Sequence, residues 1–385
     1  MTIYTLTGQV TDLAGQTASA DVGVTVDVNA PATWGPKILE WIQPLPESLG
    51  AIILATPGDW QAKANALLPG QRLYLAAGEY GARATTFSWT RAGTATAPIT
   101  ISGIPGDPKP IIRGKINLNG PYQRWSHCIF DGPTGPTGGP GPNGESILVN
   151  LQGNELELSD CEMRFDYWHA GIGANAAISR YRILNCYIHD NGGYLGDYTD
   201  PQNNTSHGLY LSPSYFGLIA NCLIEHNDAK GLMGRHDSHN LLIVHNTIVA
   251  NGRPGSESWE QTHDWTWANN IFLNNGNVKG GVGISMGGIG PGFLNRRNVF
   301  WHNNTGTSLT DEWSGVGTTS EPLVADPQCV RPAVYTPHQD PAPNWDHHLL
   351  AGSPAIGYGD PDYSMPFDLE GKPRVGRFDA GAYQF

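Results

Sequence analysis

The sequence predicts an all-β protein, folded as a single-stranded right-handed parallel β-helix whose coils each contain about 24 residues. Three observations support this prediction. The same residue types recur in columns at nearly constant spacing, short strand-forming runs alternate with turns, and glycine (49) and proline (29) are abundant. A single coil of this kind cannot bury its own apolar face, so neighbouring coils must stack on one another.

The columns are clearest between residues 161 and 303. The first has spacings of 25, 36, 24, 24 and 28 residues and contains Cys161, Cys186, Cys222, Asn246, Asn270 and Asn298. The second follows five residues later and contains Asp166, Asn191, Asn227, Asn251, Asn275 and Asn303. A buried asparagine needs a partner for its amide, and a ladder of asparagine above asparagine supplies one. We therefore predict two inward-facing ladders, with the three cysteines as buried free thiols.

A second strand precedes each column and begins with glycine, as in 208–211 (GLYL) and 231–234 (GLMG). Side chains alternate between the two faces of a strand. With Leu209, Leu232 and Ile284 pointing inward, the outward side chains form one face across adjacent coils. These are Tyr210, Ser212, Met233, Arg235 and Ser285.

Charge and hydropathy exclude two classes of partner. The formal net charge is −13 and there is no basic run, which argues against nucleic acid, because a phosphate backbone is bound by clustered cations. No apolar stretch reaches the ~18 residues that span a bilayer, so we expect no membrane insertion. Residues 1–20 lack the basic and apolar regions of a signal peptide. We expect an extracellular, cell-surface or virion location, reached without a signal in this chain.

Two segments resemble known β-helix proteins. Residues 50–113, with PGQRLYLAAGEY and APITISGIPGDP, are similar to the opening of the pectate-lyase-like superfamily, particularly its chondroitinase and alginate lyase branch. The resemblance implies that an amphipathic helix near residues 59–68 caps the first coil. The closing segment, with LAGSPAIGYGD, is similar to bacterial and phage β-helix surface proteins. Some of these, the tail spikes, are trimers, so the resemblance allows a homotrimer.

We predict three parts along the chain. Residues 1–28 resemble the last strands of an immunoglobulin-like module, too short to form the whole domain. Residues 29–46 are interpreted as a linker. Residues 47–385 are assigned to the β-helix with its closing segment.

The resemblance implies that the outward face of the second strand, walled by long turns, is a polysaccharide-binding groove. Two long insertions, 191–206 and 251–265, belong to this wall. Aromatic rings stack on the apolar faces of sugars, and polar groups bind hydroxyls. The predicted substrate-binding residues are Tyr194, Tyr198, Trp259, Glu260 and Trp265.

The densest polar set comes from two adjacent coils and supplies the predicted catalytic residues, His207, Tyr210, Lys230, Arg235, His236 and Asp237. A lyase for a uronic-acid polymer must neutralise the sugar carboxylate, remove the C5 proton and protonate the leaving oxygen. Arg235-His236 resembles the Arg-His-Gly element of the chondroitinase and alginate lyase family, whose arginine is the proposed acid. The base of that family is a lysine on the preceding coil, where this chain has Tyr210.

The sequence predicts no metal ligands. Calcium is the one cofactor that the resemblance leaves open, and Glu225 and Asp228 near Lys230 are its candidate ligands. His347 has no acidic partner at ligand spacing in the sequence, so we expect no site there.

The favoured function is a polysaccharide lyase, although the sequence leaves open whether the chain is an enzyme. A glycoside hydrolase would need two carboxylates flanking the scissile bond, drawn from Asp197, Asp200, Asp237, Glu257, Glu260 and Asp264. The alternatives are a non-catalytic glycan-binding or adhesion module of a phage tail or bacterial surface, and a structural spacer. Groove charge discriminates them, because an enzyme for acidic sugars needs a locally positive groove.

Each catalytic prediction has an ordinary structural alternative. His207 can be a turn residue, and Arg235 can pair with Glu260 or Asp237 at the surface. Lys230 can be a solvated side chain. We expect His207 and Arg235 to be surface positions whose truncation costs little stability.

Overall fold

The structure is a computed structural model that describes residues 2–11, 17–26, 33–132, 147–166, 169–174, 176–192, 205–288, 291–305, 312–315, 317–335 and 344–385. The chain forms two compact units, residues 1–33 and 34–385. The first unit holds an antiparallel hairpin of β1 (Thr2–Thr11) and β2 (Thr17–Val26). The immunoglobulin-like origin of this segment stays a prediction.

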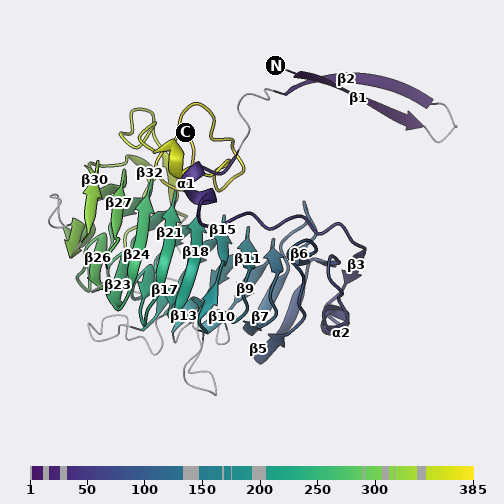
Figure 1. The fold of residues 1–385 in the computed structure, drawn as a ribbon, viewed down its shortest axis with the longest axis horizontal. Coiled ribbons are helices and arrows are strands. Elements are labelled where there is room, and N and C mark those ends of the chain that lie inside the picture. The colour runs from purple at the N-terminus through teal and green to yellow at the C-terminus, as the bar shows by residue number, and fades with distance from the viewer. Residues whose placement is uncertain are drawn as a thin grey trace. The chain divides into compact units, whose positions relative to one another are not determined.

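The second unit is a stack of coils in which three ladders of parallel strands run from one end to the other (Figure 1). The first ladder contains β3 (Ile52–Ala55), β4 (Arg72–Leu75), β6 (Ile99–Gly103), β8 (Gln123–Ser126), β11 (Leu156–Ser159), β15 (Arg182–Leu184), β18 (Ser214–Ala220), β21 (His239–Val244), β24 (His263–Ala268), β27 (Leu294–Arg296) and β30 (Thr318–Ser320).

The second ladder contains β5 (Glu79–Trp89), β7 (Ile111–Leu118), β10 (Ile147–Leu151), β13 (Ala170–Ala174), β17 (His207–Leu211), β20 (Leu232–Gly234), β23 (Ser256–Glu260), β26 (Ile284–Gly288) and β29 (Trp313–Gly315). The third starts from the same β7 and contains β9 (Ile129–Asp131), β12 (Glu162–Arg164), β16 (Tyr187–His189), β19 (Leu223–Glu225), β22 (Thr247–Val249), β25 (Ile271–Leu273), β28 (Val299–Trp301) and β31 (Leu323–Val324). This mostly-β architecture with long parallel sheets confirms the all-β, parallel-strand part of the predicted fold class.

The interior of the solenoid is filled by stacked apolar columns. Leu209, Leu232 and Ile284 are fully buried, as the strand alternation predicts. In the third ladder, Phe272 pairs with Phe300 in register, and their rings stack with centroids 5.3 Å apart. Residues of the same type lie above one another because each coil packs only against the coils next to it.

Both predicted asparagine ladders are present and fully buried. In the first, Asn246 Nδ2 donates to Asn270 Oδ1 at 3.0 Å, and Asn270 Nδ2 donates to Asn298 Oδ1 at 2.8 Å. In the second, the amides of residues 191, 227, 251 and 275 each donate to the next asparagine at 2.8–2.9 Å. The last amide, that of Asn303, donates to the buried carboxylate of Glu312.

The predicted thiols are also buried and free, and burial raises the pKa of both Cys161 and Cys186 well above the ordinary value. A thiol that stays protonated is inert, which agrees with a packing role.

The glycines that open the second-ladder strands are required by the asparagine ladder beneath them. A Cβ at Gly208 would lie 2.9 Å from Asn227 Nδ2, and one at Gly231 would lie 3.1 Å from Asn251 Nδ2. The same Cβ atoms would also approach a backbone carbonyl of the next coil to 2.6–2.7 Å. A side chain does not fit at either position, because it would meet the backbone of the next coil, an isoleucine methyl group and the asparagine amide together.

Two helices pack on the solenoid. α2 (Trp60–Asn65) places Trp60 and Ala64 in the apolar core near one end of the stack (Figure 1), within the range where a capping helix is predicted; the capping role itself stays a prediction. α1 (Pro36–Leu39) lies inside the predicted linker, yet Ile38 is fully buried against the outward side chains of Leu218 and Leu242. This packing could not be predicted from the sequence, because the segment carries no repeat. No helix among the described residues is long and apolar enough to cross a membrane.

We predict that Asn246→Leu lowers the free energy of unfolding by about 3 kcal/mol. The substitution removes the acceptor of the Cys222 N–H and the donor to the Ile219 carbonyl, both of which are buried. Chemical denaturation would measure the loss. Asn65→Leu, at an exposed position, is the control and should change stability by less than about 0.5 kcal/mol. Equal losses in the two variants would contradict a stabilising ladder.

Candidate functional site

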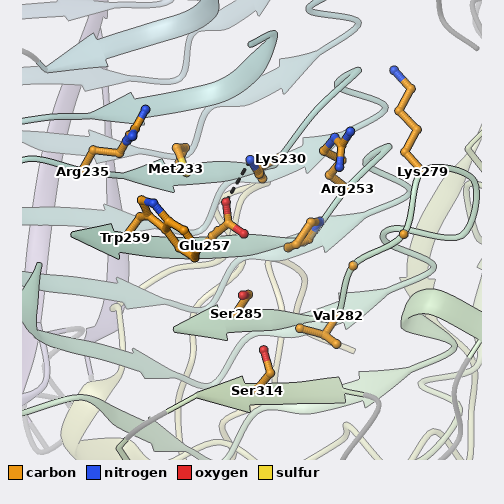
Figure 2. Close-up of a pocket in the computed structure, with 13 residues that line it drawn as sticks. Lys230, Met233, Arg235, Arg253, Glu257, Trp259, Lys279, Val282, Ser285 and Ser314 are labelled. Atoms are coloured by element: carbon orange, nitrogen blue, oxygen red, sulfur yellow. Dashed lines mark ion pairs between the residues drawn. The ribbon is translucent and has the colours of Figure 1, made fainter. Parts of the chain in front are cut away.

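An open groove of about 470 Å³ runs over the outer face of the second ladder (Figure 2). Its floor is a column of register partners from successive coils, Met233, Glu257, Ser285 and Ser314. Met233 and Ser285 belong to the predicted outward face, so the strand alternation correctly located this surface. The walls include the side chains of Lys230, Arg235, Arg253, Trp259 and Lys279.

Lys230 is buried beside this groove rather than solvated. Its side chain is only 3% exposed, and its Nζ lies 2.9 Å from Glu257 Oε2. Burial lowers the pKa of Lys230 below its ordinary value, while the Glu257 carboxylate opposes the change and the nearby guanidinium groups of Arg253 and Arg235 add to it. A lysine held this way gives up its proton more readily than a lysine in water.

His207 is also buried, which corrects the expectation of a surface position. Its Nδ1 accepts the backbone N–H of Lys230 at 3.3 Å, so the proton of the neutral ring sits on Nε2. Burial is the main cause that holds the pKa of His207 well below its ordinary value, and the positive charge of Lys230 is the second. Its ring stacks on that of Tyr210 with centroids 5.9 Å apart. The ring centroid of His169 lies 4.5 Å from that of the same tyrosine. The structure thus brings His207, Tyr210 and Lys230 together.

Arg235, His236 and Glu260 form a separate group at the groove wall. Arg235 Nη2 lies 2.6 Å from Glu260 Oε1, and the His236 ring pairs with the other oxygen of the same carboxylate. The surface pairing of Arg235 with Glu260 was one of the alternatives raised by the sequence. Asp237 points elsewhere, with its Oδ1 3.6 Å from His263 Nε2.

The predicted aromatic contacts have different outcomes. Trp259 lines the groove and is 46% exposed, so its ring is available to a ligand. Trp265 is fully buried, packs 5.4 Å from Trp267 and donates its Nε1 proton to the Ser238 carbonyl, so it cannot contact a substrate. The prediction failed because Trp265 lies in β24 rather than in the groove wall. The positive φ of Asp264 (54°) interrupts the strand alternation after His263, so Trp265 and Trp267 both face the core. Tyr194, Tyr198, Asp197 and Asp200 lie outside the described residues.

The groove is locally positive. Its described lining holds four cations, Lys230, Arg235, Arg253 and Lys279, against one carboxylate, Glu257. Two further carboxylates, Glu260 and Asp228, pair with Arg235 and Lys279 from just outside. Cations therefore outnumber carboxylates within the described lining, in a chain whose formal net charge is −13. Such a groove attracts acidic polymers.

Arg253 and Lys279 were missed by the sequence analysis, yet the repeat contains a signal for them. Lys230, Arg253 and Lys279 stand three, two and four residues after the ladder asparagines 227, 251 and 275. All three therefore occupy the same turn of successive coils, between an asparagine of the second ladder and the groove strand.

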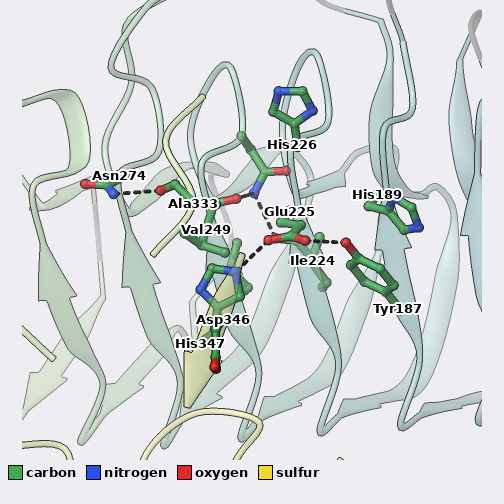
Figure 3. A network of polar contacts seen from close by, with 12 residues as sticks. Tyr187, His189, Ile224, Glu225, His226, Val249, Asn274, Ala333, Asp346 and His347 are labelled. Atoms are coloured by element: carbon green, nitrogen blue, oxygen red, sulfur yellow. Dashed lines mark hydrogen bonds and ion pairs between the residues drawn. The ribbon is translucent and has the colours of Figure 1, made fainter. Parts of the chain in front are cut away.

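The residues predicted to bind calcium do not fit that ion. Asp228 Oδ1 accepts from Lys279 Nζ at 2.5 Å and from the Tyr335 hydroxyl at 2.6 Å. Glu225 is bound by His347 Nε2 at 2.6 Å and by the Tyr187 hydroxyl (Figure 3). Calcium needs several available oxygens, and these carboxylates already serve as ion-pair and hydrogen-bond partners.

The Glu225 network belongs instead to the docking of the C-terminal segment. His347 lies on β33 (Asp346–Leu349) and reaches an acidic partner 122 residues earlier in the chain, which no local spacing in the sequence indicates. Beside it, His189 contacts the carboxylates of Asp190 and Glu162. Burial opposes protonation of His189, but these two carboxylates outweigh it and raise its pKa to about 9. The network holds the segment against the third ladder.

Comparisons with known proteins identify the fold. Residues 116–305 match the family model for the right-handed β-helix region. The chain is similar to the crystal structure of pectate lyase Pel9A, with a TM-score of 0.55 and 11% identity over 88% of this chain and 97% of that one. It is also similar to a mannuronic-acid-specific family 6 polysaccharide lyase from human gut microbiota (TM-score 0.47, 16% identity, 71% of this chain and 59% of that one). No curated protein matches the sequence. The chain is a right-handed β-helix, and carbohydrate-active enzymes are among the structures that it resembles.

We predict that Glu257→Gln destabilises the protein by about 3 kcal/mol, because it leaves the buried ammonium of Lys230 without its carboxylate partner. The double variant Lys230→Met/Glu257→Gln removes both charges and should recover most of this loss. Equilibrium denaturation of the two variants measures the difference. A double variant that is less stable than Glu257→Gln would show that the charge pair is not what stabilises this position.

Proposed function

We propose that this chain is a polysaccharide lyase that cleaves an acidic, uronate-containing polymer in the groove over β20, β23, β26 and β29. The observation that carries the proposal is the excess of cations in that groove, one of which is a buried lysine with a lowered pKa. The pectate lyase with the same fold supports the substrate class by analogy alone.

The groove provides the contacts that such a polymer needs. Arg235 is 37% exposed along its side chain, so its guanidinium group can bind a sugar carboxylate, and Arg253 lines the same wall. The exposed ring of Trp259 offers an apolar platform for a sugar face. Cations and one aromatic side by side suit a chain of uronate rings better than a neutral glycan.

The reaction of such a lyase is a β-elimination. A base removes the C5 proton of the uronate, the freed electron pair forms the C4=C5 double bond, and the C4–O bond breaks as the leaving oxygen takes a proton. Binding of the sugar carboxylate by a guanidinium group stabilises the negative charge that develops when the C5 proton leaves.

We assign the base to Lys230, because burial favours its neutral amine, which must accept the C5 proton. Tyr210, on the preceding coil and stacked on His207, is the group assigned to protonate the leaving oxygen. His207 acts as a positioning residue, since its Nδ1 holds the backbone of Lys230. Arg235 binds the sugar carboxylate in this scheme.

A hydrolase is less well supported. Two carboxylates must flank the bond that a glycosidase cleaves. Among the described lining residues Glu257 is the single carboxylate, and it is engaged with Lys230. A non-catalytic glycan-binding module would use the same cations and the same tryptophan, so turnover is the property that separates it from an enzyme.

We predict a rise in the ultraviolet absorbance of the C4=C5 double bond when the protein is mixed with one of alginate, pectate, chondroitin or hyaluronan, each tested with and without Ca²⁺. Lys230→Met should reduce kcat by at least about 100-fold, the range for loss of a general base. Lys63→Met, at a surface salt bridge on α2, is the matched control and should retain activity.

Other outcomes decide between the remaining functions. New reducing ends without the absorbance rise would replace the lyase with a hydrolase. Retardation of the protein in a gel that contains one of the polymers, without any cleavage, would replace it with a binding module.

We also predict the direction of the pH dependence. The base must be neutral, so kcat/KM should rise with pH and level off below 10.5, the ordinary pKa of lysine, because burial lowers the pKa of Lys230. Glu257→Gln removes the carboxylate that raises this pKa, and should shift the rise to lower pH. A rate profile that falls as pH increases through this range would exclude Lys230 as the base.

A further inference from the structure

Three metal-ligating side chains gather beside the groove but outside it. His239 and His263 open β21 and β24 and are register partners, with their rings stacked at 4.5 Å and 15°. Asp237 precedes β21 in the same turn that carries Arg235. One ligand atom from each of Asp237, His239 and His263 lies within 4.8 Å of the other two. We propose that these three residues bind a divalent transition-metal ion of the zinc class.

The hydrogen bonds of the two histidines orient them for this role. His239 Nδ1 lies 2.6 Å from Asn240 Oδ1, and His263 Nδ1 lies 2.7 Å from Asp264 Oδ2. Both partners are acceptors, so each Nδ1 donates and each neutral ring presents the lone pair of Nε2. An oxygen acceptor on the second ring nitrogen is the arrangement found around histidines that ligate metals.

The three ligand atoms also need a positive partner. His263 Nε2 lies 3.6 Å from Asp237 Oδ1, and with neutral rings these atoms, together with His239 Nε2, are all acceptors. Acceptors gathered within 4.8 Å of one another create a negative potential that favours a cation between them. A bound metal ion satisfies all three at once.

The chemistry of the set selects the class of ion. Two imidazoles with one carboxylate suit zinc, cobalt or nickel, whereas calcium and magnesium prefer oxygen ligands. A histidine binds a metal in the plane of its ring, so bonds of about 2.0–2.2 Å require one of the two stacked rings to rotate and the ligand atoms to move closer together. The 56% exposed carboxylate of Asp237 can turn toward them. Three protein ligands leave a coordination position for water.

The position of the site indicates what the metal does. It joins the turn of one coil, through Asp237 and His239, to the next coil through His263. The same two coils carry Arg235 and Glu260, which pair at the groove wall. A metal ion would therefore stabilise the packing of these coils and fix the wall without touching a reacting atom. The site stands whether or not the groove is that of a lyase.

The test is a metal titration of the full chain after treatment with EDTA. We expect Co²⁺ to give a saturable visible absorption band at one ion per chain, Zn²⁺ to displace it, and Ca²⁺ and Mg²⁺ to have no effect. Zn²⁺ should also raise the melting temperature. His239→Gln and His263→Gln should each weaken binding by at least about 10-fold, and Asp264→Asn by about 10-fold through the orientation of His263.

His127→Asn is the matched control for adventitious binding to a surface histidine. Both nitrogens of His127 are engaged, Nδ1 with Asp160 at 2.7 Å and Nε2 with the Asp107 carbonyl at 3.0 Å, so its loss should leave binding unchanged. Absence of a saturable cobalt band, or equal affinity in wild type and both glutamine variants, would overturn the proposal. Should either glutamine variant unfold, Asp237→Asn decides the outcome, because its side chain is exposed and its change leaves the stacked rings in place.

Discussion

The requirement that a buried amide be paired governs the rest of this structure. Along both ladders each inward asparagine except the last donates to the asparagine of the next coil, because an unpaired buried amide is costly. This pairing keeps the coils between residues 191 and 303 in register. It also determines the glycines, which leave room for the amides, and it aligns the outward side chains into the continuous floor of the groove.

Features that repeat with the coil could be predicted from the sequence, and features that depend on a single contact could not. The ladders, the buried thiols and the outward face of the second strand follow from columns of like residues. The burial of Lys230 could not be predicted in this way, because its partner Glu257 lies on the next coil and no residue near Lys230 in the sequence indicates the pairing. His347 and Glu225 are 122 residues apart, and α1 carries no repeat at all. Trp265 was misplaced because the positive φ of Asp264 interrupts the strand alternation and turns the next side chain into the core.

The same scaffold supports two sites of different character. In the groove, burial and the nearby charges of Arg235 and Arg253 both lower the pKa of Lys230, which lies beside Glu257. At the neighbouring edge, register stacks two histidines of successive coils. In both cases the repeat brings chemically useful groups together at the spacing of one coil, so a substitution in one coil acts on a partner in the next.

The second asparagine ladder also has a direction. Each side-chain amide from Asn191 to Asn275 donates toward the coil that follows, so the bond dipoles add along the axis of the solenoid instead of cancelling. Hydrogen bonds in such a row polarise one another. The positive end of the row meets the carboxylate of Glu312, which compensates it much as an acidic residue compensates the start of a helix. The row of asparagine amides therefore has a net dipole along the solenoid axis, with a carboxylate at its positive end. The two ends of the solenoid differ in electrostatic potential although its coils repeat.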